Sequence, residues 1–301
     1  MKLASLSYLA LQGSGVLALA RRVRSGGVIL CYHNVVRDDA PNDPLGLHLP
    51  LARFERQLQW LAGNYDLVSL GDFAARRSRG DSLRGAAALT FDDGYAGVFQ
   101  HAWPLLRDRR APATVFVVAH APAAAEPFWW DHPDLPPDAP EGERRRWLTS
   151  LRGDRRAILE SVGARNGARR VPPDRFPASW AAIAAAAGEG LSLGVHSATH
   201  RALPTLDGSE LRVEIVESRD LLQRHSGVRA EFFAYPYGLW NERAREMVRS
   251  AGYRAAFSLD HSGGGSDPWT LPRVNIPSGI EDSAFEAWAS GVRLRAPGRR
   301  S

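Results

Sequence analysis

Two adjacent aspartates are the first residues in this chain whose type and position suit hydrolytic chemistry. Asp92 and Asp93 stand together and Gly94 follows them. Because residues that leave a strand into a glycine turn need not point the same way, one carboxylate could bind a metal while the other acts as a base. Asp-Gly sequences are also ordinary turns, so these residues alone do not define a site.

A pair of histidines, His196 and His200, has a spacing that can serve one metal ion. Two imidazoles four residues apart can ligate the same ion if the segment forms a helical turn or a tight loop. The alternative is that each is a structural histidine, because such pairs also arise by chance. An aspartate from another strand end would complete a His-His-Asp set with open positions, which is typical of catalytic metal sites.

Polar residues of this kind follow several of the predicted strands. Four apolar runs are followed in this way. His33 follows residues 28–32, Asp92 follows 86–91, His196 follows 191–195, and a loop follows 231–235, which ends at Tyr235. Such runs are typical of buried strands. In α/β barrels the carboxyl ends of the strands meet on one face and carry the active site. We therefore expect the separate motifs to form one site.

The remaining pattern predicts alternating helices and strands. Helices are expected at 51–61, 98–107 and 209–225, further strands at 67–70, 113–119, 255–259 and 271–276, and a polar loop at 37–49. This order favours a parallel sheet or barrel with helices outside. Proline, arginine and alanine dominate residues 122–188, which we interpret as a mostly helical insertion. The catalytic domain is expected over residues 26–301.

The composition argues against a disordered chain and against a bundle embedded in a bilayer. The 301 residues are 44% hydrophobic and 24% charged, as in ordinary soluble domains. The net charge of +5 comes from arginine clusters that have no nucleic-acid-binding motif beside them. The single cysteine, Cys31, cannot form an intrachain disulfide and is expected to be a buried strand residue.

Residues 1–25 are predicted to form an amphipathic helix. Their basic residues mostly follow the apolar run, unlike those of a signal peptide, and Gln12 to Gly15 interrupt it short of the roughly 20 apolar residues that a membrane span needs. The helix is expected to pack on the domain or to lie at a membrane surface. A cytoplasmic or membrane-peripheral location is favoured over secretion.

Three motifs together resemble the polysaccharide deacetylase (NodB homology) family, carbohydrate esterase family 4. They are Thr-Phe-Asp-Asp-Gly at 90–94, His-Ser-Ala-Thr-His at 196–200 and Phe-Ala-Tyr-Pro-Tyr-Gly at 233–238. The resemblance covers about residues 28–276 and implies a distorted (β/α) barrel of about seven parallel strands. It implies a metal-dependent hydrolase that removes N-acetyl groups from amino sugars of a polysaccharide or glycoconjugate and releases acetate.

The resemblance also implies a role for each matched residue. Asp92 would be the general base, and Asp93, His196 and His200 would bind a divalent metal, with Zn²⁺ favoured over Co²⁺, Ni²⁺ or Mn²⁺. The backbone N–H of Tyr95 would stabilise the oxyanion. Residues expected to contact the substrate are Trp130, Tyr235, Pro236, Tyr237 and Gly238.

The chain departs from the family pattern in two places. Many members have an arginine where this chain has Ala234, and Arg273 is our candidate to orient the base instead. No Leu-x-His motif occurs after Ile276, so His33 is expected to be the general acid, as in the subgroup with that histidine on an N-terminal strand. His261 is the alternative acid.

Other functions remain open at this stage. The same site could deacetylate or deformylate a lipid-linked or small N-acylated sugar. A barrel that binds carbohydrate without catalysis is another alternative, although all the catalytic and ligand residues are present. A structural membrane-associated protein would account only for residues 1–24.

Overall fold

Seven parallel strands close into a barrel in the computed structural model, which describes residues 2–38, 43–164, 171–259 and 267–294. The strands are β1 (Val28–Tyr32), β5 (Ala86–Phe91), β6 (Ala113–Val117), β7 (Ser192–Val195), β8 (Phe232–Ala234), β9 (Ala255–Leu259) and β10 (Leu271–Asn275). They are ordered β1-β10-β9-β8-β7-β6-β5, and β5 pairs with β1 to close the ring. The predicted seven-stranded (β/α) barrel is confirmed.

The strands are largely apolar because most of their residues are buried on both faces of the sheet. Every residue of β1 and β5 is buried. Successive side chains alternate between the two faces, so that Ile29 and Ala88 join one apolar cluster while Leu30 and Leu89 join the other. The smaller cluster fills the barrel interior, and the larger one packs against the helices.

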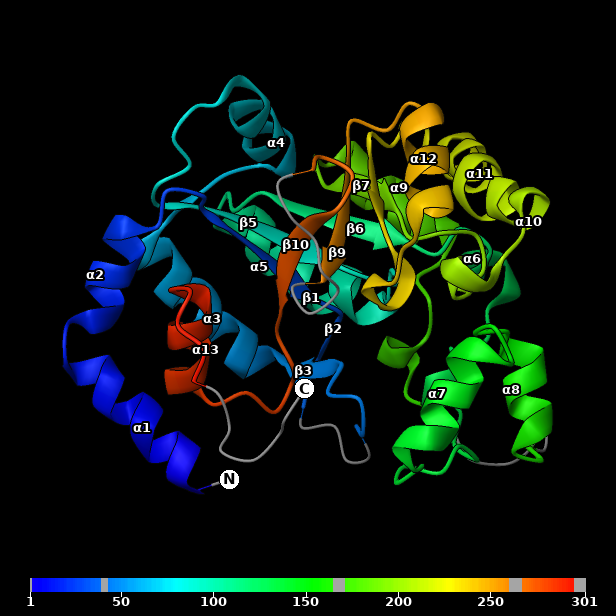
Figure 1. Cartoon of the computed structure of the whole chain (residues 1–301), viewed down its shortest axis with the longest axis horizontal. Helices are drawn as coiled ribbons and strands as arrows, with labels where there is room; N and C mark the ends of the chain where they lie inside the picture. The colour runs from blue at the N-terminus through cyan, green and yellow to red at the C-terminus, as the bar shows by residue number, and fades with distance from the viewer. Residues whose placement is uncertain (1, 39–42, 165–170, 260–266, 295–301) are drawn as a thin grey trace.

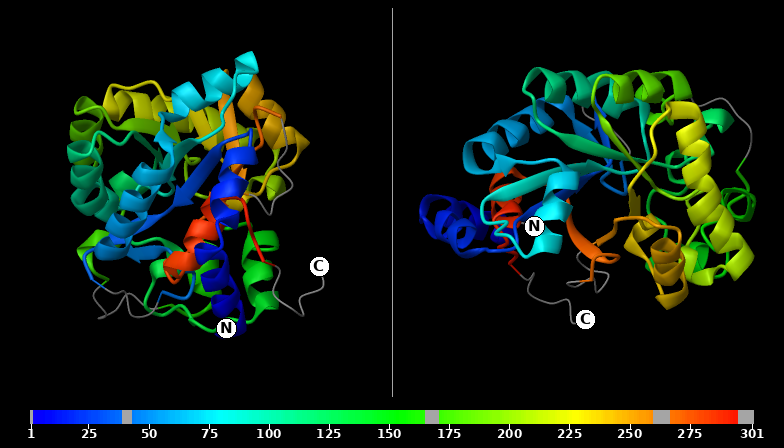
Figure 2. Two further views of the ribbon diagram at one scale, coloured as in Figure 1. Left: turned by 90° about the vertical axis from the view of Figure 1, so that its left-hand side faces the viewer. Right: turned by 90° about the horizontal axis from the view of Figure 1, so that it is seen from above.

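Helices surround the barrel on its outside (Figure 2). They are α3 (Leu51–Asn64), α5 (Trp103–Asp108), α9 (Trp180–Gly188), α10 (Gly208–Arg212), α11 (Ser218–Ser226) and α12 (Glu242–Ser250). The helix α4 (Leu70–Arg79) instead packs Leu70 and Phe73 into the smaller cluster and covers one end of the barrel. Side chains of Ser69, Ser179 and Asn241 cap the amino ends of α4, α9 and α12. Each cap satisfies a backbone N–H that has no partner inside its helix.

Local differences from the predicted elements have simple causes. The strand predicted at 67–70 is only β4 (Asp66–Leu67), because Ser69 caps α4 and so starts a helix at Leu70. The predicted polar loop contains β3 (His48–Pro50), which pairs with β2 (Asn34–Val36). The helix predicted at 98–107 begins with a π-helical turn (Val98–Ala102) that leads into α5. A second π-helical turn (Val213–Glu217) interrupts the helix predicted at 209–225.

The segment predicted as an insertion is mostly helical where the structure describes it. It contains α6 (Ala121–Ala124), a 3₁₀ turn at Trp129–Asp131, α7 (Glu141–Thr149), α8 (Arg155–Ser161) and a 3₁₀ turn at Pro173–Arg175. Figure 1 shows α7 and α8 projecting from the barrel at the lower right. The barrel helix α9 closes the segment, so only part of the predicted range lies outside the barrel.

The amino-terminal stretch forms two helices, α1 (Lys2–Gly13) and α2 (Val16–Val23). They pack beside α13 (Asp282–Ala289), where the Trp288 indole N–H donates to the Tyr8 hydroxyl at 3.0 Å (Figure 1). The single predicted helix is therefore broken, at Ser14 and Gly15, and Gly15 has a φ of 74°. No helix in the described ranges has the length and hydrophobicity to cross a bilayer.

Candidate active site

The alternation of side chains along the strands builds the site in layers inside the barrel. One level of the barrel interior is formed by Cys31 on β1, Thr90 on β5 and Arg273 on β10. Each of them comes two positions after an inward-facing residue of its strand, and because side chains alternate along a strand, each faces the interior as well. Arg273 Nη1 donates to Thr90 Oγ1 at 3.2 Å, which ties two of these strands together. Asp92 comes two residues after Thr90 and lies one level nearer the carboxyl ends.

Asp92 is held in place by two neighbours in this buried layer. Arg273 donates Nη1 to Asp92 Oδ1 at 2.6 Å and Nη2 to Oδ2 at 2.7 Å, and the Cys31 thiol donates to Oδ2 at 3.3 Å. Burial acts to raise the pKa of Asp92, but the charge and hydrogen bonds of Arg273, together with the neighbouring histidines, outweigh it and hold the pKa below its usual range. Asp92 is therefore ionised and fixed in orientation.

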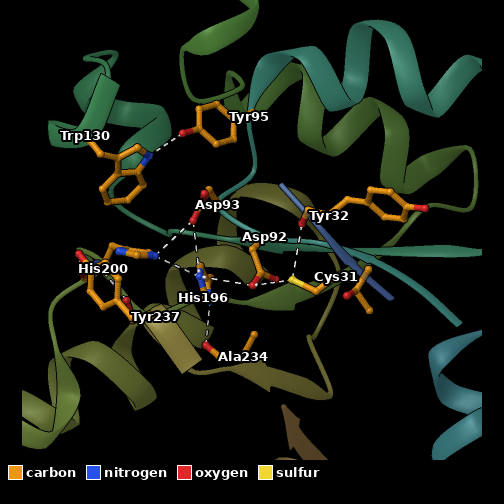
Figure 3. Close-up of polar contacts among 12 residues, drawn as sticks. Cys31, Tyr32, Asp92, Asp93, Tyr95, Trp130, His196, His200, Ala234 and Tyr237 are labelled. Atoms are coloured by element: carbon orange, nitrogen blue, oxygen red, sulfur yellow. Dashed lines mark hydrogen bonds and ion pairs between the residues drawn. The ribbon is translucent and has the colours of Figure 1, made fainter. Parts of the chain in front are cut away.

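A sharp turn directs the next carboxylate to a different place. Asp93 and Gly94 both have positive φ, 71° and 78°. A Cβ at position 94 would touch Val117 at 3.4 Å, and the φ there suits glycine best. Because the chain turns sharply at these residues, Asp92 stays beside Arg273. Asp93 instead points toward the two histidines (Figure 3).

Asp93, His196 and His200 form a compact cluster of three ligand atoms (Figure 3). The distances are 3.2 Å from Asp93 Oδ1 to His200 Nε2, 3.5 Å from Asp93 Oδ1 to His196 Nε2, and 3.1 Å between the two Nε2 atoms. Ligands about 2.1 Å from zinc at tetrahedral angles would lie roughly 3.4 Å apart. The three side chains fit a single small divalent cation.

A backbone carbonyl orients the His196 ring, and a buried carboxylate holds the loop that carries His200. His196 Nδ1 lies 2.9 Å from the Ala234 carbonyl oxygen and donates to it, which leaves Nε2 with its lone pair toward the cluster. Burial lowers the pKa of His196 to about 4, so the ring is neutral at pH 7. The buried Glu214 carboxylate accepts from the Ala198 and Thr199 amides, both at 2.9 Å, and so holds the loop that carries His200.

Trp130 belongs to a buried polar network beside the metal-ligand cluster. Its ring lies 4.6 Å from the His200 ring, centroid to centroid, and its indole N–H donates to the Tyr95 hydroxyl at 2.7 Å. That hydroxyl donates to Asp131 at 2.6 Å, and His48 Nε2 lies 2.7 Å from the other Asp131 oxygen. The backbone N–H of Tyr95 has no acceptor among the described residues.

His33 lies at the mouth of this layer, next to Asp92. One of its ring nitrogens is within 4.8 Å of both the Cys31 sulfur and an Asp92 oxygen. It lines a cavity of about 190 Å³ together with Asp92, Asp93, His196 and His200. The structure thus brings His33 to the predicted site, and its role as the acid stays a prediction. His261 falls outside the described residues.

The third motif divides between the cavity and the core. Tyr237 and Gly238 line the cavity, and the Tyr237 hydroxyl donates to the His200 carbonyl at 3.1 Å. Tyr235 is fully buried away from it, and its hydroxyl donates to the Trp269 carbonyl at 2.8 Å. Pro236 is buried as well. Neither side chain lines the cavity, and the predicted substrate contacts of Tyr235 and Pro236 stay predictions.

A family model described as polysaccharide deacetylase matches residues 79–256. The chain belongs to this family, and it is an N-acetyl-sugar deacetylase by class. The match spans more than half of the sequence and includes Asp92, Asp93, His196 and His200, which lie together in the structure.

Two curated relatives resemble most of the chain. Poly-β-1,6-N-acetyl-D-glucosamine N-deacetylase of Escherichia coli (strain K12) is 25% identical over 287 residues, which are 91% of this chain but 40% of the relative. YxkH of Bacillus subtilis (strain 168) is 20% identical over 269 residues, 88% of this chain and 76% of the relative. The chain therefore spans less than half of the Escherichia coli enzyme.

Two solved structures share the fold. IcaB from Ammonifex degensii has a TM-score of 0.60 at 21% identity and covers 89% of this chain and 98% of its own. The deacetylase PplD from Streptococcus pyogenes has a TM-score of 0.59 at 18% identity and covers 84% of this chain and 93% of its own. At this level of identity the likeness supports the barrel architecture alone.

Proposed function

We propose that this chain uses a divalent metal to hydrolyse the N-acetyl group of an amino sugar. Asp93, His196 and His200 hold the metal, and zinc is the preferred ion. The observation that carries the proposal is the spacing of these three ligand atoms beside the ionised Asp92. Cobalt, nickel and manganese would suit the same mixed nitrogen and oxygen ligands. When bound, the cation supplies a Lewis acid for the acetamide carbonyl and for water.

The residues around the ligand cluster have distinct tasks in this reaction. Asp92, fixed by Arg273, accepts a proton from the attacking water. The Tyr95 N–H donates a hydrogen bond to the tetrahedral oxyanion. His33, which lines the same cavity as Asp92, donates a proton to the departing amine. The products are acetate and a free amino sugar.

The experiment that tests this function measures metal and product together. Metal-loaded protein is incubated with a panel of N-acetylated glycans, and free amine is detected by mass spectrometry. Poly-β-1,6-N-acetyl-D-glucosamine, which the name of the Escherichia coli relative gives as its substrate, is one of the polymers to include. Chito-oligosaccharides and small amides separate sugar deacetylation from general amide hydrolysis.

The variant Asp92→Asn separates the base from the ligands. It is expected to retain the metal and to lower turnover by about 10²–10⁴-fold, the usual contribution of a positioned base. Loss of metal together with activity would mean that the roles of Asp92 and Asp93 are exchanged.

We also propose that α2 rests on an anionic membrane surface. Val16, Leu19 and Val23 expose 45%, 61% and 68% of their area, and the exposed Arg22 lies among them. An apolar face bordered by arginine matches an interfacial helix. Cosedimentation with vesicles containing anionic lipid should fall for Leu19→Ser with Val23→Ser, but not for the exposed control Val213→Ser. Equal binding by all three proteins would contradict this contact.

A further inference from the structure

Apart from the catalytic residues and Arg144, the described side chains that line the cavity over the metal-ligand cluster are mostly apolar. One wall comes from the insertion and contains Trp129, Trp130, Trp147 and Leu148. Leu45 and Leu47, from the segment before β3, line the cavity as well. The two segments therefore enclose the space above Asp93 and His200 with tryptophan and leucine side chains.

The polar atoms of the aromatic walls are already used within the protein. The Trp129 indole N–H donates to the Tyr237 hydroxyl at 3.2 Å, and the Trp147 indole N–H donates to Glu143 at 3.0 Å. The Trp130 indole is bound to Tyr95. The Tyr237 hydroxyl donates to a backbone carbonyl. These walls have no donor left for a ligand hydroxyl.

One charged side chain outside the catalytic group lines the described part of the cavity. It is Arg144, whose Nη2 donates to the Pro137 carbonyl at 3.0 Å. A sugar ring buried against these walls would leave most of its hydroxyls without partners, which costs free energy. An aliphatic group would instead gain free energy by leaving water.

We propose that this cavity binds an apolar group carried by the amino sugar, so that the substrate class is an N-acylated amino sugar with an aliphatic chain. The proposal rests on the proposed deacetylase function for the identity of the scissile bond. The chain could be a glycosidic substituent or a lengthened N-acyl group, because both place hydrocarbon next to the amide. A cavity of about 150 Å³ with apolar walls accepts a benzene-sized ligand, so about six carbons suit this one.

Two substrate series distinguish the sources of the chain. The first is alkyl glycosides of N-acetylglucosamine from methyl to hexyl, and the second is glucosamine N-acylated from acetyl to hexanoyl. Each buried methylene is worth roughly fourfold in affinity. The value of kcat/KM for the metal-loaded protein should rise by about tenfold or more along one series. The series that rises shows where the chain is attached.

A binding measurement separates the cavity from the reaction. Hexyl glucoside and methyl glucoside lack the amide, so calorimetric titration reports binding alone. Hexyl glucoside should bind at least about tenfold tighter, at roughly fourfold per methylene. Tight binding with no amine released from any substrate would refute the deacetylase function and leave the cavity proposal standing. Equal binding of both glucosides, or flat kcat/KM in both series, would overturn the cavity proposal.

A matched pair of variants places the effect in this wall. Leu148→Gln introduces a polar group into the cavity, and Leu159→Gln makes the same change at a half-buried site on α8 of the same insertion. The hexyl-to-methyl affinity ratio should fall by about fourfold or more in Leu148→Gln, the equivalent of one buried methylene. It should be unchanged in Leu159→Gln. An equal loss in both variants would also contradict the assignment.

Discussion

Arg273 and Asp92 form a bidentate ion pair inside the barrel, with N–O distances of 2.6 and 2.7 Å and both side chains buried. Two parallel hydrogen bonds fix the plane of the carboxylate as well as its position. The pair joins β10 to the end of β5. A base that is ionised and oriented before substrate arrives loses no free energy to reorganisation during the reaction.

Removing the arginine should therefore harm both stability and turnover. Arg273→Met leaves the Asp92 charge buried and unpaired, and the free energy of unfolding should fall by about 3–5 kcal/mol. Urea denaturation measures this change. The double variant Arg273→Met with Asp92→Leu removes both charges and should recover much of the loss. Additive losses in the two single variants and the double variant would show that the pair is not energetically coupled.

Arg273 could be predicted because the sequence lacks an arginine at the expected place. Ala234 faces the barrel interior, and its carbonyl oxygen accepts a hydrogen bond from His196 Nδ1. The guanidinium comes from β10 instead, because Arg273 faces the barrel interior and reaches the Asp92 carboxylate from there. Strand ends and strand period therefore predicted the inner layer of the site, including His33 and both aspartates.

The supporting network could not be predicted in the same way. His48 lies on a three-residue strand inside a segment interpreted as a polar loop, and Asp131 lies in the insertion. The 2.7 Å contact between them joins residues 83 positions apart. Neither segment has a periodic pattern that would place it. The sequence pattern does not predict the role of Glu214 either, because this buried carboxylate lies at a π-helical turn of an otherwise regular helix.

Loss of a histidine ligand should remove the metal without unfolding the barrel. His200→Ala is expected to lower metal content well below one ion per chain and to abolish turnover, because two protein ligands remain. Elemental analysis after dialysis measures the metal. His225→Ala, an exposed histidine on α11, is the matched control and should retain both. Full metal content in His200→Ala would refute the ligand assignment.

The thiol of Cys31 should be unreactive while the protein is folded. Burial raises the pKa of Cys31 well above its ordinary value, so the thiol stays protonated and inaccessible at pH 8. Because the unfolded thiol ionises near pH 8.5, this group's contribution to stability is complete below that pH and is lost as pH rises. Alkylation by iodoacetamide, which reports on the single cysteine, should be fast only in urea. Rapid alkylation of native protein would contradict the buried placement.

The prediction that His33 is the general acid can be tested with leaving groups that differ in how strongly they need a proton. Its ring nitrogen lies within 4.8 Å of Asp92 oxygen, and its Nδ1 has no hydrogen-bond partner among the described residues. His33→Ala should retain the metal and lower turnover by about 10²–10⁴-fold on sugar acetamides. The loss should be much smaller on an anilide, whose amine departs without strong need of a proton.

Two controls decide between the histidines. His120→Ala, at an exposed position after β6, should leave turnover unchanged. His261→Ala tests the alternative acid. Normal turnover in His33→Ala together with a large loss in His261→Ala would move the acid to the C-terminal part of the chain. An equal loss on acetamides and anilides in His33→Ala would instead indicate that His33 positions Asp92 or the substrate, because a proton donor acts through the basicity of the departing amine.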